Sequence, residues 1–161
     1  MTNPTSADSL QVHVVKPEDD LDTLVAQINS AQWDDANEMT TYDTASLSEY
    51  LRCSDTVFVV CHDASTIPPT LLGFASSRFQ LKPYDRERWL YVDEVDVAAD
   101  QRRRGVGKAI MSKLISLAQE HGCEEVWLGT EPDNDPANAL YQSLDPDEAE
   151  SFVGYTFETD D

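Results

Sequence analysis

The sequence is poor in positive charge. Its 11 lysines and arginines stand against 31 aspartates and glutamates, a formal net charge of −20, and no lysine or arginine follows Lys113. A surface of this sign repels phosphate groups, so nucleic acids and anionic membranes are disfavoured as partners. Two explanations of the acidity stay open: a solubilising surface suited to high salt, and an acidic groove that binds a polycationic substrate.

Long apolar runs and cysteines are also scarce. No apolar segment approaches the length of a membrane span, and the polar start MTNPTSADS is unlike a signal peptide. The three cysteines have neither an even count nor the spacing of metal ligands, so we expect reduced thiols, no metal site and a cytoplasmic protein. The 161 residues suffice for one domain, which we expect to span residues 1–161 with residues 1–9 flexible.

The most informative stretch is residues 91–119. It begins with alternating apolar and acidic residues, which predicts a strand with one buried face. Val95 and Val97 lie on one side of this strand, and Glu94 and Asp96 lie on the other. The turn RRRGVGK follows, and the apolar residues after it recur at helical spacing. The predicted order is therefore strand, basic glycine turn and helix.

The composition of this turn predicts an anion site. A helix N-terminus has unpaired backbone N–H groups and about half a positive charge, and glycines allow a phosphate to approach the backbone. A Walker loop and a dinucleotide fingerprint are excluded, because neither GK[ST] at the required spacing nor GxGxxG occurs. The plain alternative is a solvated basic turn. The residues of the predicted diphosphate cradle are Arg102, Arg103, Arg104, Gly105, Val106, Gly107 and Lys108.

Patterns elsewhere predict the remaining elements. Strands are expected at 11–16, 56–61, 71–81, 89–97, 125–128 and 151–157, and helices at 17–30, 44–51, 106–121 and 137–144. Three consecutive strands form an antiparallel meander, whose last strand leads through a helix into a parallel neighbour. The acidic stretch QWDDANEMTTYD is either a substrate-lining loop or an ordinary surface loop.

The sequence RRRGVG at residues 102–107 matches the [QR]xxGx[GA] signature of the GNAT superfamily of acetyl-CoA-dependent N-acetyltransferases. The predicted element order also resembles the GNAT fold, an α/β (α+β) architecture with a mixed central sheet of about six to seven strands and about four helices. The resemblance implies that the amides of the turn bind the pyrophosphate of acetyl-CoA. It also implies that backbone groups at Val95 and Val97 hold the pantetheine and thioester.

A narrower resemblance is to the short aminoglycoside 3-N-acetyltransferases. The segments YLRCSDTVFVV, LGFASSRFQLKPYDRER, WLYVDEVDVAADQRRRGVGKAI and NDPANALYQSL have the same order and spacing, from about Tyr50 to the end of the chain. The chain departs from that family after Leu144, where DP replaces the usual glycine. The resemblance implies that Asn138 and Tyr141 face the cofactor, that the enzyme is a homodimer and that a small polycationic amine is the acceptor.

The chemistry calls for a base, because a protonated amine cannot attack a thioester. Glu94 is the first choice, since it matches an acidic residue on this strand in those enzymes, whereas Asp96 is expected to point at solvent or at a basic loop. A backbone N–H near Val97 would polarise the thioester oxygen. Tyr141 would protonate the leaving thiolate, or is alternatively a core aromatic. The acids expected to bind the substrate, or to be merely solvated, are Asp93, Asp96, Glu131, Asp133 and Asp135.

These features together predict an enzyme that transfers an acetyl group from acetyl-CoA to the 3-amine of an aminoglycoside antibiotic and so confers resistance. One alternative keeps the chemistry but has a polyamine, a small metabolite or a protein amine as the acceptor. A second alternative is a non-catalytic module that binds acyl-CoA.

Overall fold

The computed structural model describes residues 9–34 and 39–160. The chain forms two compact units, one ending at Gly129 and the other beginning at Thr130. The first contains β1 (Leu10–Val14), α1 (Leu21–Ser30), α2 (Thr44–Arg52), β2 (Thr56–Asp63), β3 (Thr70–Leu81), β4 (Arg88–Val97), the 3₁₀ helix η2 (Ala99–Gln101), α3 (Val106–Glu120) and β5 (Glu125–Trp127). The second contains α4 (Asp135–Ser143).

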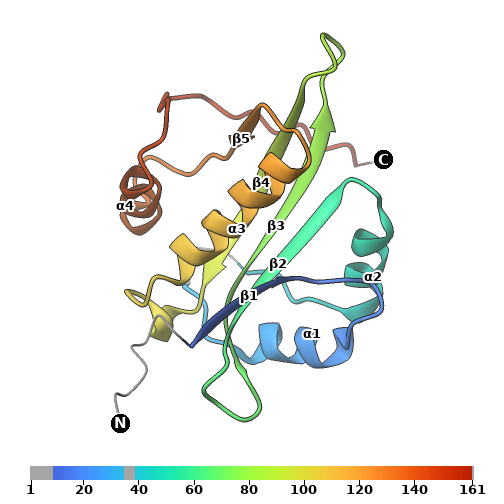
Figure 1. The fold of residues 1–161 in the computed structure, drawn as a ribbon, viewed down its shortest axis with the longest axis vertical. Helices are drawn as coiled ribbons and strands as arrows, with labels where there is room; N and C mark the ends of the chain where they lie inside the picture. Colours follow the sequence, from blue (N-terminus) through green and yellow to red (C-terminus); the bar gives the residue numbers. More distant parts are fainter. Residues whose placement is uncertain (1–8, 35–38, 161) are drawn as a thin grey trace. The chain divides into compact units, whose positions relative to one another are not determined.

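The first unit is built on one sheet with the strand order β1-β2-β3-β4-β5 (Figure 1). The first four strands are antiparallel to their neighbours, and β5 is parallel to β4. The predicted meander and the strand–helix–strand crossover are confirmed, because β4 leads through α3 into β5. The predicted mixed α+β class is confirmed as well. In the described parts of the chain, no helix combines the length and apolar character needed to cross a membrane.

The prediction of a sixth strand at 151–157 is wrong. Residues 151–160 form no strand, so the described chain has a five-stranded sheet, not one of six to seven. Large apolar side chains there are exposed, with Tyr155 at 80% and Phe157 at 85%. A β-rich composition favours an extended backbone, but a strand also needs a neighbour to hydrogen-bond with, and local composition does not encode one.

The helices begin at aspartate and asparagine caps. The predicted helix at Pro17 begins only at Leu21, after the N-cap Asp20, whose carboxylate accepts a hydrogen bond from a backbone amide of the first turn. Asp43 caps α2 and Asn134 caps α4, and the side chain of each accepts a hydrogen bond from a first-turn amide. Each helix begins at the residue whose side chain accepts a hydrogen bond from the first-turn amides. Several neighbouring residues in the sequence have side chains that could cap the helix in this way.

A β-bulge in β4 changes the direction of its side chains. Val92 pairs with Ser77 of β3 and Glu94 pairs with Ser76, so Asp93 is an extra residue on β4. Directly paired residues share a face of the sheet. The even-numbered residues up to Val92 therefore face one side, whereas Glu94 and the even-numbered residues after it face the other.

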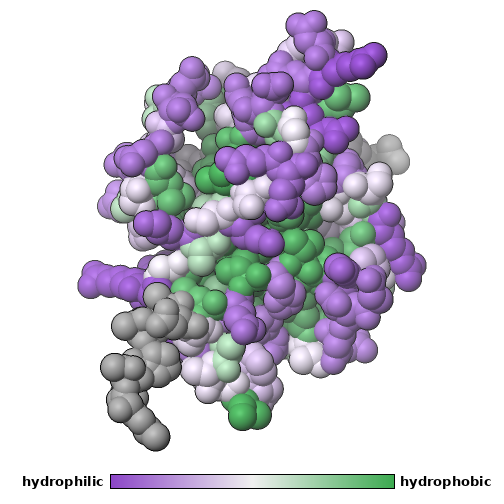
Figure 2. Space-filling model, in the orientation of Figure 1, coloured by the Kyte–Doolittle hydropathy of each residue, from purple (hydrophilic) through white to green (hydrophobic). Residues whose placement is uncertain are grey.

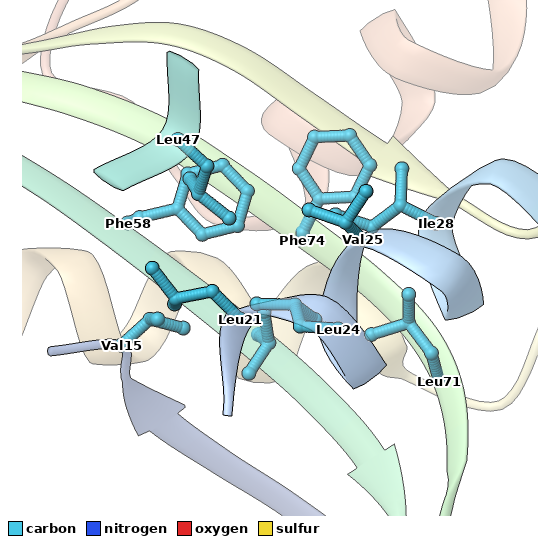
Figure 3. Packing of buried hydrophobic residues seen from close by; sticks show 10 residues of the cluster. Val15, Leu21, Leu24, Val25, Ile28, Leu47, Phe58, Leu71 and Phe74 are labelled. Atoms are coloured by element: carbon cyan, nitrogen blue, oxygen red, sulfur yellow. The ribbon is translucent and has the colours of Figure 1, made fainter. Parts of the chain in front are cut away.

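The Glu94 side of the sheet is covered by α1 and α2. Figure 2 shows hydrophilic residues over much of one face of the molecule, with apolar residues between them. Figure 3 shows side chains of both helices converging on Phe58 and Phe74, whose rings stack with centroids 5.4 Å apart. The core cluster consists of Val15, Leu21, Leu24, Val25, Ile28, Leu47, Phe58, Val60, Leu71 and Phe74.

Candidate active site

The basic glycine turn leads directly into α3. Gly105 is the N-cap residue and has φ 81°, a left-handed conformation that glycine adopts without strain. Since glycine has no side chain to cap the helix, the first-turn amides keep the unpaired donors typical of an N-terminus. The first helical hydrogen bond runs from the amide of Ala109 to the carbonyl of Gly105 over 2.9 Å. A Cβ placed on Gly105 would meet no atom within 4 Å, so an anion can approach this backbone.

One arginine of the turn ties it to the sheet. Arg104 donates a hydrogen bond to Asp63 at the end of β2 over 2.8 Å and another to Gln101 over 2.6 Å. The Asp63 side chain is 10% exposed. Hydrogen bonds from Ser65 and from the Arg104 guanidinium hold the pKa of Asp63 well below its usual range. This ion pair therefore stabilises the turn that precedes α3.

The other cations of the turn differ in their surroundings. Arg102 forms an ion pair with Asp34, in the segment after α1. Arg103 and Lys108 are exposed, and Arg103 has the left-handed φ of 66°. From the sequence, all four cations were predicted to bind the diphosphate. The motif RRRGVGK does not show which of them have acidic partners elsewhere in the chain.

The ladder between β4 and β5 ends before β4 does. β5 pairs with β4 from Trp89 to Tyr91, and the described ladder ends where Tyr91 pairs with Trp127. β4 continues to Val97 along β3, so its later residues have no β5 ladder on their other edge. Val95 and Val97, predicted to hold the pantetheine, are half-buried in this part of β4.

Gly73 on β3 places α3 against the sheet, and sequence reasoning assigned it no role. A Cβ on Gly73 would lie 2.7 Å from the Asp96 carbonyl oxygen, 3.0 Å from Val106 and 3.1 Å from Ile110. The 2.7 Å distance to the Asp96 oxygen is shorter than real Cβ contacts, and this oxygen belongs to the backbone, so it cannot move aside as a side chain could. The missing side chain thus lets the start of α3 approach the end of β4. An isolated glycine inside a strand pattern was the available signal.

Glu94 lines a hollow of about 350 Å³ on the first unit. Its carboxylate is half-buried and accepts a hydrogen bond from the Tyr42 hydroxyl at 3.5 Å. Burial and the negative charges of Glu94 and Asp96 raise the pKa of Tyr42, so this hydroxyl stays protonated and can donate. The residues that line the hollow are Met39, Thr40, Thr41, Tyr42, Asp43, Ser46 and Glu94.

The acidic stretch between α1 and α2 was interpreted either as a substrate-lining loop or as an ordinary surface loop, and its place beside the hollow favours the first. Residues 39–43 line it, and residues 35–38 lie outside the described chain. The sequence indicated no particular residue of this stretch, because it has no periodicity. Tyr42 and its neighbours were therefore missed as candidate site residues.

The other carboxylates on β4 lie in different environments. Asp96 is only 3% exposed, so the expectation that it points at solvent is wrong. The bulge explains the error, because it turns Glu94 and Asp96 toward the face that α1 and α2 cover. Asp93 is exposed and forms an ion pair with Arg78 at 3.6 Å.

The second unit contains the remaining predicted site residues. The Asn138 amide donates to the carbonyl oxygens of Glu131 at 3.0 Å and Asn134 at 2.9 Å, and so links α4 to the loop before it. Tyr141 is half-buried on α4. The acids of the predicted substrate lip, Glu131, Asp133 and Asp135, are exposed, as both the substrate-binding and the solvated reading require.

Comparisons with known proteins point to one family. The model of the acetyltransferase (GNAT) family matches residues 21–145. No curated protein sequence matches the chain. The solved structure of aminoglycoside acetyltransferase meta-AAC0020, from an uncultured soil metagenomic sample and in complex with sisomicin, is similar with a TM-score of 0.81 and 19% identity. The match covers 95% of this chain and 98% of that one.

Two further solved structures are similar. Aminoglycoside acetyltransferase HMB0005, also from an uncultured soil metagenomic sample, has a TM-score of 0.77 and 21% identity over 94% of this chain and 99% of that one. A ribosomal-protein-alanine N-acetyltransferase from Brucella melitensis biovar Abortus 2308 has a TM-score of 0.68 and 18% identity over 93% and 99%. At these identities the likeness shows a shared fold.

Proposed function

The chain belongs to the acetyltransferase (GNAT) family, and on that premise we propose that it acetylates a primary amine of an aminoglycoside, at the 3-N position, and thereby confers resistance. The observation that carries this proposal is the Glu94 carboxylate at the wall of a hollow lined otherwise by hydroxyl-bearing side chains, Asp43 and Met39. An ammonium-bearing, polyhydroxylated molecule is the ligand that such a lining suits.

The cosubstrate proposed is acetyl-CoA, which GNAT acetyltransferases use in general and which supplies an activated acetyl thioester. The uncapped amides at the start of α3 would bind its diphosphate, and the exposed Arg103 and Lys108 would add positive charge. Arg102 and Arg104 would keep the turn in place through Asp34 and Asp63. The backbone of β4 beyond the β5 ladder would hold the pantetheine.

Glu94 would act as the general base. It would accept the proton that the acceptor ammonium must lose before its nitrogen attacks the thioester carbon, after which the carbon–sulfur bond breaks. The roles of Tyr141, as the acid that protonates the leaving sulfur, and of Asn138 stay predictions. The aminoglycoside as acceptor is supported by the similar protein solved with sisomicin and by the net charge of −20, which attracts a polycation.

The test is a screen of acetyl-CoA turnover with aminoglycosides, polyamines and peptide amines, followed by the substitution Glu94→Gln. We expect aminoglycosides to be acetylated, and kcat to fall by about 10²- to 10⁴-fold in Glu94→Gln because the base is lost. The Kd of acetyl-CoA, measured by calorimetry, should not change. Glu49→Gln, which neutralises an exposed glutamate on α2, is the matched control.

Each outcome has a defined meaning. Unchanged turnover in Glu94→Gln would show that Glu94 is not the base. Acetylation of polyamines or peptide amines alone would refute the aminoglycoside assignment and keep the chemistry. Binding of acetyl-CoA without turnover on any amine would favour the non-catalytic module. Expression in a sensitive bacterium tests resistance directly, through a raised inhibitory concentration of the antibiotic.

A further inference from the structure

Tyr42 is the residue through which the loop before α2 reaches Glu94. Its ring packs edge-on against Phe74, with centroids 5.5 Å apart, and against Phe58 at 6.2 Å. Both phenylalanines belong to the core cluster and are at most 1% exposed. The ring therefore has a fixed position, and the hydroxyl at its end is directed to the Glu94 carboxylate.

The backbone of Tyr42 is fixed as well. The Asn29 side chain on α1 donates to the Tyr42 carbonyl oxygen at 2.8 Å, and its amide oxygen accepts from the Tyr42 N–H at 2.9 Å. One side chain thus satisfies both backbone groups of Tyr42, as a neighbouring strand would. Two residues further on, the Thr44 hydroxyl donates to Asp22 of α1 at 2.7 Å. The loop is therefore tied to α1 at two points.

The hydroxyl of Tyr42 is not needed for this packing. Ring contacts and backbone hydrogen bonds already hold the residue, and phenylalanine would keep both. A glutamate side chain at the wall of an open hollow otherwise has several rotamers, and ordering it costs conformational entropy. A hydrogen bond from a fixed donor selects one of these rotamers. The Tyr42 hydroxyl contacts one carboxylate oxygen at 3.5 Å, and the other lone pairs of the carboxylate can still accept a proton from a ligand.

We propose that Tyr42 is a positioning residue, whose hydroxyl holds the Glu94 carboxylate toward the acceptor amine, and that Asn29 holds Tyr42 in place for this task. The inference rests on the proposed function, because it takes Glu94 as the base. The other carboxylates near this contact are Asp43, which lines the same hollow, and Asp96, whose negative charge acts on Tyr42.

The first test is Tyr42→Phe, which removes one oxygen atom and keeps the ring. We expect kcat to fall by about 10- to 100-fold, as for a misplaced catalytic group, with an unchanged KM for acetyl-CoA. A kcat within twofold of the wild type would overturn the proposal.

Tyr50→Phe is the matched control. The Tyr50 hydroxyl donates to the carbonyl oxygens of Ser77 at 2.7 Å and Val57 at 3.1 Å, so the same change removes hydrogen bonds that only support the sheet. We expect a lower melting temperature with a kcat close to that of the wild type. If Tyr50→Phe lowers kcat as far as Tyr42→Phe does, general loosening of the fold explains the effect and the positioning role is refuted.

A second variant tests the role of Asn29. Asn29→Ala removes both hydrogen bonds to the Tyr42 backbone, so kcat should fall as it does in Tyr42→Phe. In the double variant, the loss in kcat expressed as a free energy should be smaller than the sum of the losses in the two single variants, because both substitutions act on one contact. Full additivity would show that Asn29 acts independently of Tyr42.

A final measurement needs no turnover. The carboxyl carbon of Glu94 is followed by ¹³C NMR in glutamate-labelled protein, with its signal assigned by its loss in Glu94→Gln. Its chemical shift at pH 7 should change in Tyr42→Phe and stay the same in Tyr50→Phe, and an unchanged shift in Tyr42→Phe would refute the contact. If no amine is acetylated at all, the proposed function fails, while this chemical shift still decides whether Tyr42 acts on Glu94.

Discussion

At the scale of the residue, Gly73 shows how the absence of a side chain sets the distance between a helix and a sheet. In Gly73→Ala the new methyl group meets the backbone carbonyl of Asp96 at 2.7 Å, so α3 or β4 must shift. We expect the free energy of unfolding to fall by about 1 to 3 kcal/mol, the range for overpacked cores. Acetyl-CoA affinity should fall as well, since the amides of the first helical turn are displaced.

Urea unfolding and calorimetry measure these two effects of Gly73→Ala. The matched control is Gly154→Ala, because a Cβ on Gly154 would meet no atom within 4 Å. That change should alter the free energy of unfolding by less than about 0.5 kcal/mol. Equal stability of the two variants would show that α3 can move away from β3 without cost.

Two residues of the site differ in how well the sequence predicts them. Alternation along one strand marks Glu94 and Asp96 together, and the choice of Glu94 as the base came from the resemblance to the aminoglycoside 3-N-acetyltransferases. Tyr42 could not be predicted, since its contact with Glu94 spans 52 residues of chain and its backbone partner Asn29 lies on another element. Neither contact has a local pattern.

At the scale of the element, the ion pair of Arg104 and Asp63 joins the turn before α3 to the end of β2. The pKa of Asp63 is lowered in the folded protein, so its ionised form contributes stability that is fully present above the pKa of the unfolded state. That stability is lost as the pH falls from about 4 toward the lowered folded-state pKa. Asp63→Asn should therefore be less stable than the wild type at pH 7, with a gap that narrows in acid.

Chemical unfolding from pH 7 down to pH 2 measures this gap. Asp147→Asn removes an exposed aspartate and is expected to follow the wild type throughout. A stability difference for Asp63→Asn that is the same at both ends of the pH range would contradict the assignment of Asp63 as the partner that stabilises the turn.

Element boundaries could be predicted where the signal is local. The turn RRRGVGK and the glycine that follows α3 mark both ends of that helix, and Gly122 has the left-handed φ of 69° expected at its end. The predicted strand at 151–157 failed for the opposite reason. Its apolar residues satisfy the composition of a strand, but they are exposed and lack a ladder in the described chain.

For the whole molecule, the net charge of −20 makes stability depend on salt. Like charges repel one another in the compact state, and salt screens them with a Debye length of about 30 Å at 0.01 M and 10 Å at 0.1 M. The melting temperature should therefore rise when KCl increases from about 0.01 to 0.5 M. Circular dichroism measures it, and sucrose at matched osmolality controls for effects other than screening.

The higher salt range separates the two explanations of the acidity. A melting temperature that continues to rise in molar KCl would favour a surface suited to high salt, whereas a plateau would favour ordinary screening and leave the acids available for a polycation. A melting temperature that stays level or falls between about 0.01 and 0.5 M KCl would contradict the role of charge repulsion. The homodimer and the cytoplasmic location stay predictions.

Local patterns predict the mixed α+β class, the strand–turn–helix unit and the place of Glu94 on a strand. Each depends on a period of side chains or on backbone preferences over a few neighbouring residues. The anion site at the start of α3 stays a prediction. The packed chain was needed to show that Asp96 is buried, that Arg104 is paired with Asp63 and that Tyr42 contacts Glu94. Those outcomes depend on a bulge in the pairing of two strands and on contacts between distant segments, and such pairings arise only when the chain packs.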